Sequence, residues 1–164
     1  MDVTAALLES WDRQCRILDA VTSQVDDTTR HLKPSEDGWP LDHQLAHIHQ
    51  VRRFWLHNAA PAAAEGLAST FTDGWETPIA DLAAIKASLQ QSHRAIWDAM
   101  AAMLEANDQK VGGYDHPVLY LQHMIWHEGW HVGLILLALR LAGHEPAEMW
   151  QETNIWGHWR TEEF

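Results

Sequence analysis

The chain has 164 residues, 46% of them hydrophobic, and a formal net charge of −12 at pH 7. This length suits one domain with its own core, and the hydrophobic share excludes wholesale disorder. Nucleic-acid binding relies on clustered Lys and Arg, whereas here 11 basic residues are scattered among 23 acidic ones. No apolar run approaches the ~20 residues of a membrane span, and no signal-peptide pattern is present. We therefore expect a soluble, cytoplasmic protein that binds neither nucleic acid nor membrane.

Histidine and tryptophan are unusually frequent, with 12 and 10 copies. Histidine is the commonest metal ligand among the side chains, so its number directs attention to a metal site. The single cysteine, Cys15, excludes an internal disulfide and fits a reducing compartment. Cys15 lies on the apolar stripe of the first expected helix, so we interpret it as a small core residue and not as a nucleophile.

Four segments show the hydrophobic periodicity of helices, and none shows the sustained alternation of a strand. Proline near the start of three segments, and Gly143 just after the fourth, are typical of helix ends. The expected helices cover about residues 3–27, about residues 40–60, a segment that opens at Thr77-Pro78, and a segment from near Pro117 to Gly143. Four helices of this length predict an all-α fold, and specifically a four-helix bundle.

The connection between the second and third expected helices, Pro61 to Pro78, is long, at roughly 18 residues. At ~3.3 Å per extended residue, it is long enough to cross the ~30 Å length of a 20-residue helix. This length permits an up-down-down-up bundle with a long crossover between helices two and three. An up-down-up-down bundle with one loose loop stays open.

The last segment, residues 148–164, contains three tryptophans and four acidic residues. A solvated tail would rarely contain so many large aromatic side chains. We therefore divide the chain into a bundle over residues 1–147 and a Trp-rich tail over residues 148–164. The tail is expected to pack on the bundle or to take part in a dimer interface.

The strongest local signal lies in the fourth expected helix, where His127 and His131 are four residues apart. On a helix this spacing places both side chains on one face, within reach of one ion. The two histidines interrupt an apolar stripe that is formed by Tyr120, Met124, Leu134, Ala138 and Leu141. A buried imidazole needs a partner for each ring nitrogen, and two neighbours rarely find them all without water or metal. We interpret the pair as metal ligands, with two hydrogen-bonded core histidines as the alternative.

His127-Glu128-Gly129-Trp130-His131 also matches the H-E-x-x-H pattern of zinc proteases. The extended protease motif requires Gly and His where this chain has Leu134 and Leu137, and no strand signal precedes the pattern. A protease is therefore disfavoured. A di-iron bundle is disfavoured as well, because the Glu-x-x-His motif occurs on one helix only. Glu128 remains a candidate proton relay or a neighbour of the metal ligands.

The second expected helix contains His43, His47 and His49. At about 100° per residue, His47 lies inside the apolar arc, beside Val51 and Phe54. His43 lies at the margin of this arc, and His49 falls on the opposite side, where we expect it to be solvated. His47 is therefore the candidate third ligand.

Three further side chains lie close to the candidate ligands. Gln44 shares the apolar arc one turn before His47, and is expected to contact a ligand. His123 lies one turn before His127, and we expect His123 and His43 to contact the ligands or to face the substrate. Three histidines leave one position of a tetrahedral ion for water or substrate, which is typical of catalytic zinc. Zinc is the expected ion, with nickel or another first-row metal as the alternative.

These motifs together resemble the DinB/YfiT-like superfamily. The resemblance rests on Gly38-Trp39-Pro40, Leu45-Ala46-His47-Ile48, and, far downstream, His123, His127, Glu128, His131 and Gly133. It covers about residues 3–143, and implies an up-down-down-up four-helix bundle, often a homodimer. It also implies a metal centre whose three ligands are His47, His127 and His131. Leu134 departs from the pattern, because many members have Gln there.

The resemblance implies two kinds of metal-dependent enzyme with a small-molecule substrate. One is a thiol S-transferase that uses bacillithiol, mycothiol or a related small thiol, and the other is a hydrolase. Both fit a three-histidine zinc ion, because such an ion lowers the pKa of a bound thiol or water. A non-catalytic metal-binding bundle and a purely structural bundle remain as alternatives, and we take the transferase as the leading hypothesis.

Overall fold

The computed structural model describes residues 2–161, which form six α-helices, one short 3₁₀ helix and no strand. The predicted all-α class is therefore confirmed. The elements are α1 (Val3–Ser23), α2 (Leu41–Ala59), α3 (Pro61–Ala64), α4 (Leu82–Glu105), α5 (Pro117–Leu141), α6 (Glu148–Asn154) and the 3₁₀ helix η1 (Trp156–Trp159). Within the described residues, no helix is both long and apolar enough to cross a membrane.

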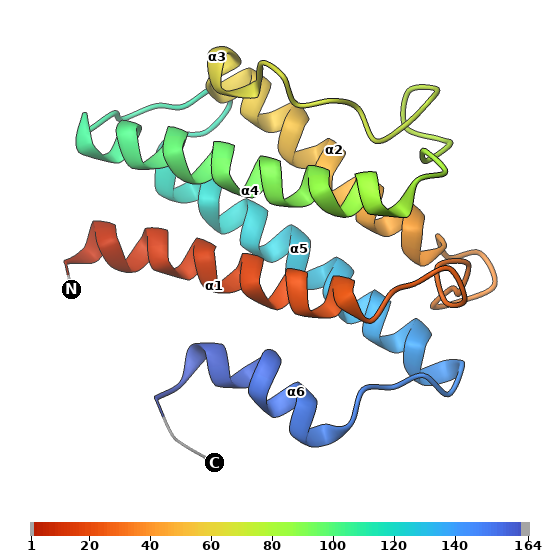
Figure 1. Cartoon of the computed structure of the whole chain (residues 1–164). Helices are drawn as coiled ribbons and strands as arrows, with labels where there is room; N and C mark the ends of the chain where they lie inside the picture. Colours follow the sequence, from red (N-terminus) through yellow and green to blue (C-terminus); the bar gives the residue numbers. More distant parts are fainter. Residues whose placement is uncertain (1, 162–164) are drawn as a thin grey trace.

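The four long helices, α1, α2, α4 and α5, lie side by side (Figure 1). α1 packs against α4 and α5, and α2 packs against the same two helices. In Figure 1, α1 and α5 run in one direction, whereas α2 and α4 run in the other. The connection from α2 to α4 passes through α3 and then returns along the length of the helices. α2 and α5, which contain the candidate ligands, are therefore antiparallel neighbours.

The start of α4 differs from the prediction. The sequence pattern predicts a helix from Thr77-Pro78, whereas α4 begins only at Leu82. The Asp73 carboxylate accepts hydrogen bonds from the backbone N–H and the hydroxyl of Thr77, at 2.7 and 2.8 Å, and so stabilises a turn. Asp81 then caps α4, because its carboxylate accepts a hydrogen bond from a backbone N–H of the first turn.

Buried apolar side chains from all four long helices form the core. Cys15 is 2% exposed, and its prediction as a core residue is confirmed. The buried face of α5 is rotated from the predicted stripe, since Leu141 is exposed while Glu128 is fully buried. The same holds for α2, where Phe54 is exposed and Arg52 is buried. Hydrophobic periodicity predicts that only apolar side chains face the core. Here α2 and α5 also bury Arg52 and Glu128, whose opposite charges pair with each other.

The C-terminal segment lies along the outside of α1. α6 and η1 both contact α1, and Ile155 between them is buried. Trp150 packs against the core, whereas Trp156 and Trp159 are about half exposed. The predicted division of the chain at residue 148 stays a prediction, as does the dimer interface.

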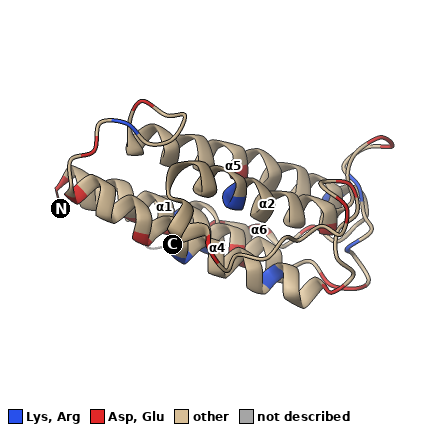
Figure 2. Ribbon diagram, turned by 90° about the horizontal axis from the view of Figure 1, so that it is seen from above, with Lys and Arg blue, Asp and Glu red and all other residues tan. Residues whose placement is uncertain are grey.

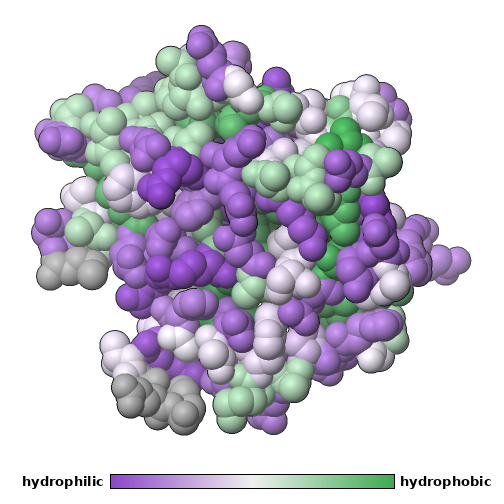
Figure 3. Space-filling model, viewed as in Figure 1, coloured by the Kyte–Doolittle hydropathy of each residue, from purple (hydrophilic) through white to green (hydrophobic). Residues whose placement is uncertain are grey.

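The charged side chains are distributed over the surface. Figure 2 shows Lys and Arg singly among the Asp and Glu residues, without a continuous basic stripe on the described helices. On the face shown in Figure 3, hydrophilic residues predominate, and hydrophobic ones are visible between them and in small patches on the surface. This distribution agrees with the acidic net charge of −12.

Candidate metal centre

The side chains of His47, His127 and His131 converge between α2 and α5. One nitrogen from each ring lies within 4.8 Å of the other two. The Nε2 atoms of His47 and His127 are 3.3 Å apart. Two ligands of one tetrahedral zinc ion, each with a Zn–N bond of about 2.0–2.1 Å, are separated by about 3.4 Å. The pair of His47 and His127 therefore has the spacing that a single ion requires, and a nitrogen of His131 lies within 4.8 Å of both.

A hydrogen bond to Gln44 orients the ring of His131. Nδ1 of His131 lies 3.1 Å from Oε1 of Gln44, and this amide is buried. An amide oxygen only accepts, so Nδ1 donates its proton and Nε2 keeps a free lone pair. The Gln44 amide nitrogen in turn donates to the carbonyl oxygen of Trp39, at 3.3 Å. The contact between Gln44 and a candidate ligand is thus present, and it is made to His131.

All three rings are neutral near pH 7, which is the form that binds a metal. Burial lowers the pKa of His47 and of His127 to about 4, and that of His131 to about 3. The neighbouring imidazoles lower the pKa of His127 and His131 further, because two cations at this distance repel each other. Nδ1 of His127 is buried and has no hydrogen-bond partner among the described residues. Three neutral imidazoles that bring their lone pairs close together are chemically suited to a cation.

Aromatic rings surround the open side of the histidine cluster. The Trp39 ring stacks on His43 at 4.6 Å and contacts His47 at 4.9 Å between centroids. The Trp75 ring meets the edge of His47 at 5.6 Å. Trp39 and Trp75 are 46% and 40% exposed, and His47 and His127 are half-buried. The cluster is therefore reachable from solvent, and apolar surface flanks the approach.

The comparisons with known proteins identify the family. A model of the DinB family matches residues 1–162, which is almost the whole chain. The chain belongs to the DinB family. No curated protein and no solved structure matches it. The resemblance that the sequence motifs indicate is thereby confirmed, and the three clustered histidines of this DinB-family chain are compatible with a metal site.

His43 and His123 flank the cluster at its two ends in the DinB-family chain. His43 is half-buried against Trp39, and its Nε2 atom is buried without a partner among the described residues. Nδ1 of His123 lies 2.6 Å from the Tyr114 hydroxyl, and its ring is 6.4 Å from that of His127. Neither ring belongs to the three-nitrogen cluster. Their roles as ligand neighbours or substrate-facing groups stay predictions.

Glu128 is fully buried in the core and is not part of the cluster. Its two carboxylate oxygens accept hydrogen bonds from Nε and Nη2 of Arg52, at 2.6 and 2.8 Å. Arg52 also donates to the carbonyl oxygen of Leu89 on α4, at 2.7 Å. A relay role for Glu128 stays a prediction, and the contacts favour a structural role. Arg52 is not among the predicted site residues, although an Arg on the apolar side of a helix is a signal for a buried partner.

The prediction that His49 is solvated is wrong. His49 is fully buried, with Nδ1 3.1 Å from the Ser92 hydroxyl and Nε2 2.9 Å from the Ala68 carbonyl oxygen. The returning connection from α2 to α4 covers this side of α2, where the Thr70 hydroxyl donates to the Ala46 carbonyl oxygen at 2.8 Å. Periodicity within one helix does not show which connection lies over its outer face.

Proposed function

We propose that this DinB-family protein is a metal-dependent enzyme, a thiol S-transferase that uses a small thiol such as bacillithiol or mycothiol. One divalent ion, preferably zinc, would be held by His47, His127 and His131. The observation that supports this most is the convergence of three neutral imidazole nitrogens within 4.8 Å, on a side that solvent reaches. Three protein ligands and an open fourth position are typical of catalytic zinc.

The arrangement of the helices supports the fold that the family resemblance implies. α1 and α5 run against α2 and α4, and a long crossover joins α2 to α4 (Figure 1). We therefore infer an up-down-down-up four-helix bundle. In this arrangement α2 and α5 are antiparallel, so that His47 meets both His127 and His131.

The donor set fits zinc. Zinc accepts imidazole nitrogens in tetrahedral geometry, and nickel or copper binds such nitrogens at least as tightly. A bound zinc ion would supply positive charge that lowers the pKa of a coordinated thiol towards neutrality. Gln44 holds the His131 ring with Nε2 free, and thereby pre-orients one ligand.

The protein side chains around the cluster would bind and orient the organic parts of the reactants. Trp39 and Trp75 present partly exposed rings next to His47 and offer apolar surface to an electrophilic substrate. His43, whose Nε2 atom has no partner among the described residues, lies one turn from His47 and is placed to contact a bound thiol. The rings would also exclude water, which would otherwise compete with the thiol.

The test is a thiol-transfer assay of the zinc-loaded protein. A panel of bacillithiol, mycothiol and glutathione would be combined with 1-chloro-2,4-dinitrobenzene, and formation of the coloured thioether would be followed. We expect a zinc-dependent rate with at least one thiol, lost in His47→Ala and retained in His57→Ala, an exposed histidine of the same helix. The absence of any zinc-dependent rate above background would contradict transferase activity, and zinc-dependent hydrolysis of a chromogenic ester would favour a hydrolase.

A further inference from the structure

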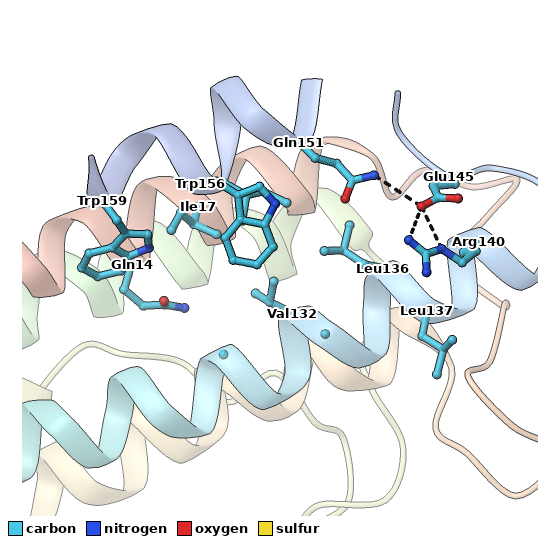
Figure 4. Close-up of a pocket in the computed structure, with 13 residues that line it drawn as sticks. Gln14, Ile17, Val132, Leu136, Leu137, Arg140, Glu145, Gln151, Trp156 and Trp159 are labelled. Carbon is cyan, nitrogen blue, oxygen red and sulfur yellow. Dashed lines mark hydrogen bonds and ion pairs between the residues drawn. The ribbon is translucent and has the colours of Figure 1, made fainter. Parts of the chain in front are cut away.

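A second cavity lies on the other side of α5 from the histidine cluster. It has a volume of about 470 Å³ and is enclosed by α1, α5 and the C-terminal segment with α6 and η1 (Figure 4). Small-molecule sites typically measure about 300–1,000 Å³, so the cavity has the size of a ligand site. None of the three clustered histidines lines it. The cavity is therefore separate from the histidine cluster.

The walls of the cavity are mainly apolar. Ile17 of α1, Val132 and Leu136 of α5, and the rings of Trp156 and Trp159 face the space (Figure 4). Two aromatic rings beside each other on one side of the cavity favour a flat ligand, which can pack against them (Figure 4). The C-terminal segment thus forms one wall of a half-open cavity on the surface of α1 and α5.

Two glycines of α5, Gly129 and Gly133, line the cavity as well. A Cβ atom added at either position would meet no atom within 4 Å. Glycine is a poorer helix former than alanine, so an unfilled position in the middle of a helix is unfavourable for stability alone. The missing side chains keep the floor of the cavity open.

One buried polar group points into this apolar space. Gln14 of α1 is 5% exposed, and its Nε2 atom is buried without a hydrogen-bond partner among the described residues. Figure 4 shows its side chain reaching from α1 towards α5 within the cavity. A buried donor without an acceptor is destabilising, and such groups are rare in folded proteins. A ligand with an acceptor atom would satisfy it.

The charged groups at the mouth of the cavity are already paired. The Arg140 guanidinium donates to the Glu145 carboxylate, with Nε and Oε1 2.8 Å apart (Figure 4). The Gln151 amide nitrogen lies 3.4 Å from the same carboxylate oxygen. Because these charges neutralise each other, the cavity offers no net charge to a ligand. It therefore favours an uncharged molecule.

We propose that this cavity is a binding site for a small, uncharged aromatic carbonyl compound, such as an aryl amide, ketone or ester. The aromatic part packs between α5, at Gly129 and Gly133, and the rings of Trp156 and Trp159, and the carbonyl oxygen accepts a hydrogen bond from Nε2 of Gln14. The site takes its ligand without the metal centre, since the two lie on different faces of α5.

The test uses 2-naphthamide as the probe and naphthalene as its analogue without the carbonyl group. Methyl-labelled full-length protein would be titrated, and the NMR signals of Ile17 and Val132 would be followed. We expect saturable shifts of both signals with 2-naphthamide, with the same affinity in His47→Ala. In Gln14→Leu the affinity for 2-naphthamide falls about 3- to 10-fold while that for naphthalene is kept, which is the effect of one hydrogen bond.

A filled cavity provides the complementary variant. Gly133→Leu adds a side chain at the open floor, where its Cβ atom meets no protein atom within 4 Å, and is expected to abolish the shifts while the protein stays folded. Three outcomes would overturn the proposal. In the first, the NMR signals do not shift up to the solubility limit of 2-naphthamide. In the second, the wild type and Gly133→Leu bind 2-naphthamide with equal affinity. In the third, the signals shift with the concentration of the protein and not with that of the probe. The last outcome would assign this face to contact between two copies of the chain.

Discussion

Arg52 of α2 and Glu128 of α5 form a fully buried ion pair, with two hydrogen bonds of 2.6 and 2.8 Å. Glu128 adjoins His127 in the sequence, and Arg52 follows His47 on the same helix. The pair therefore joins the two helices that contribute the candidate ligands, close to the point where the ligands meet. The Trp11 ring lies 4.9 Å from the guanidinium and covers it from α1.

Breaking this pair from one side should destabilise the fold strongly. Glu128→Leu leaves the Arg52 cation buried without its partner, so we expect the free energy of unfolding to fall by about 3–5 kcal/mol. Urea unfolding of the metal-free protein measures this loss. The double variant Arg52→Met with Glu128→Leu should recover most of it, because no charge is left unpaired. A cost below about 1 kcal/mol for Glu128→Leu alone would show that the pair does not hold the helices together.

The hydrogen bond between Gln44 and His131 should raise metal affinity. Gln44→Leu removes the acceptor that fixes Nδ1 of His131, and we expect zinc affinity to fall about 10- to 100-fold. Isothermal titration calorimetry measures the change. Gln50→Leu is the matched control, because Gln50 is a buried glutamine of the same helix outside the cluster, and its affinity should stay at the wild-type value. Equal zinc affinities of Gln44→Leu and Gln50→Leu would contradict a role of Gln44 in metal binding.

The metal-free protein should lose stability as the pH falls below about 6.5. The native pKa values of His47 and His127 are about 4 and that of His131 is about 3, while unfolded histidine titrates near 6.5. Between these values the unfolded chain binds more protons than the native one, so the free energy of unfolding rises with pH. Stability is thus complete above pH 6.5 and is lost towards pH 4.

Urea unfolding at several pH values measures this slope. Other histidines, among them His49 and His93, also have pKa values lowered by burial and contribute to the same slope, so the comparison uses a variant. His131→Leu should bind one proton fewer on unfolding and give a shallower dependence between pH 4 and 6.5. A slope equal to that of the wild type would contradict the neutral, buried state of His131.

His49 should act as a structural residue although it lies two positions from His47. His49→Ala removes contacts to Ser92 and to the Ala68 carbonyl, and should lower the free energy of unfolding by about 1–3 kcal/mol. Zinc stoichiometry should stay unchanged. Thermal unfolding measures the change in stability, and elemental analysis of the same sample measures the zinc content. Loss of zinc without loss of stability in His49→Ala would contradict the structural role of His49.

A helical pattern in the sequence predicts which side chains share one face of a helix. The spacing of His127 and His131 is a local property, so it correctly predicts that the two rings lie on one side of α5. The choice of His47 over His49 rests on the arc of apolar residues in α2, and the structure places the His47 ring against the other two. Family resemblance supported that choice as well.

The hydrophobic pattern of a helix does not predict contacts between residues that are far apart in the sequence. The burial of His49 depends on the connection from α2 to α4, and that of Arg52 depends on Glu128, which lies 76 residues away. A charged side chain is expected at the protein surface unless a residue of opposite charge that pairs with it in the core is known. The cavity next to Gln14 likewise depends on where the C-terminal segment lies, which no local signal shows.

The most direct test of the metal centre is zinc binding by the untagged protein and its single-histidine variants. Elemental analysis after dialysis should give one zinc per chain for the wild type and for His57→Ala, and none for His47→Ala, His127→Ala or His131→Ala. Titration calorimetry of the same proteins would report the affinities. If His47→Ala binds zinc with wild-type stoichiometry and affinity, then α2 provides no ligand, and the three-histidine centre described above is wrong.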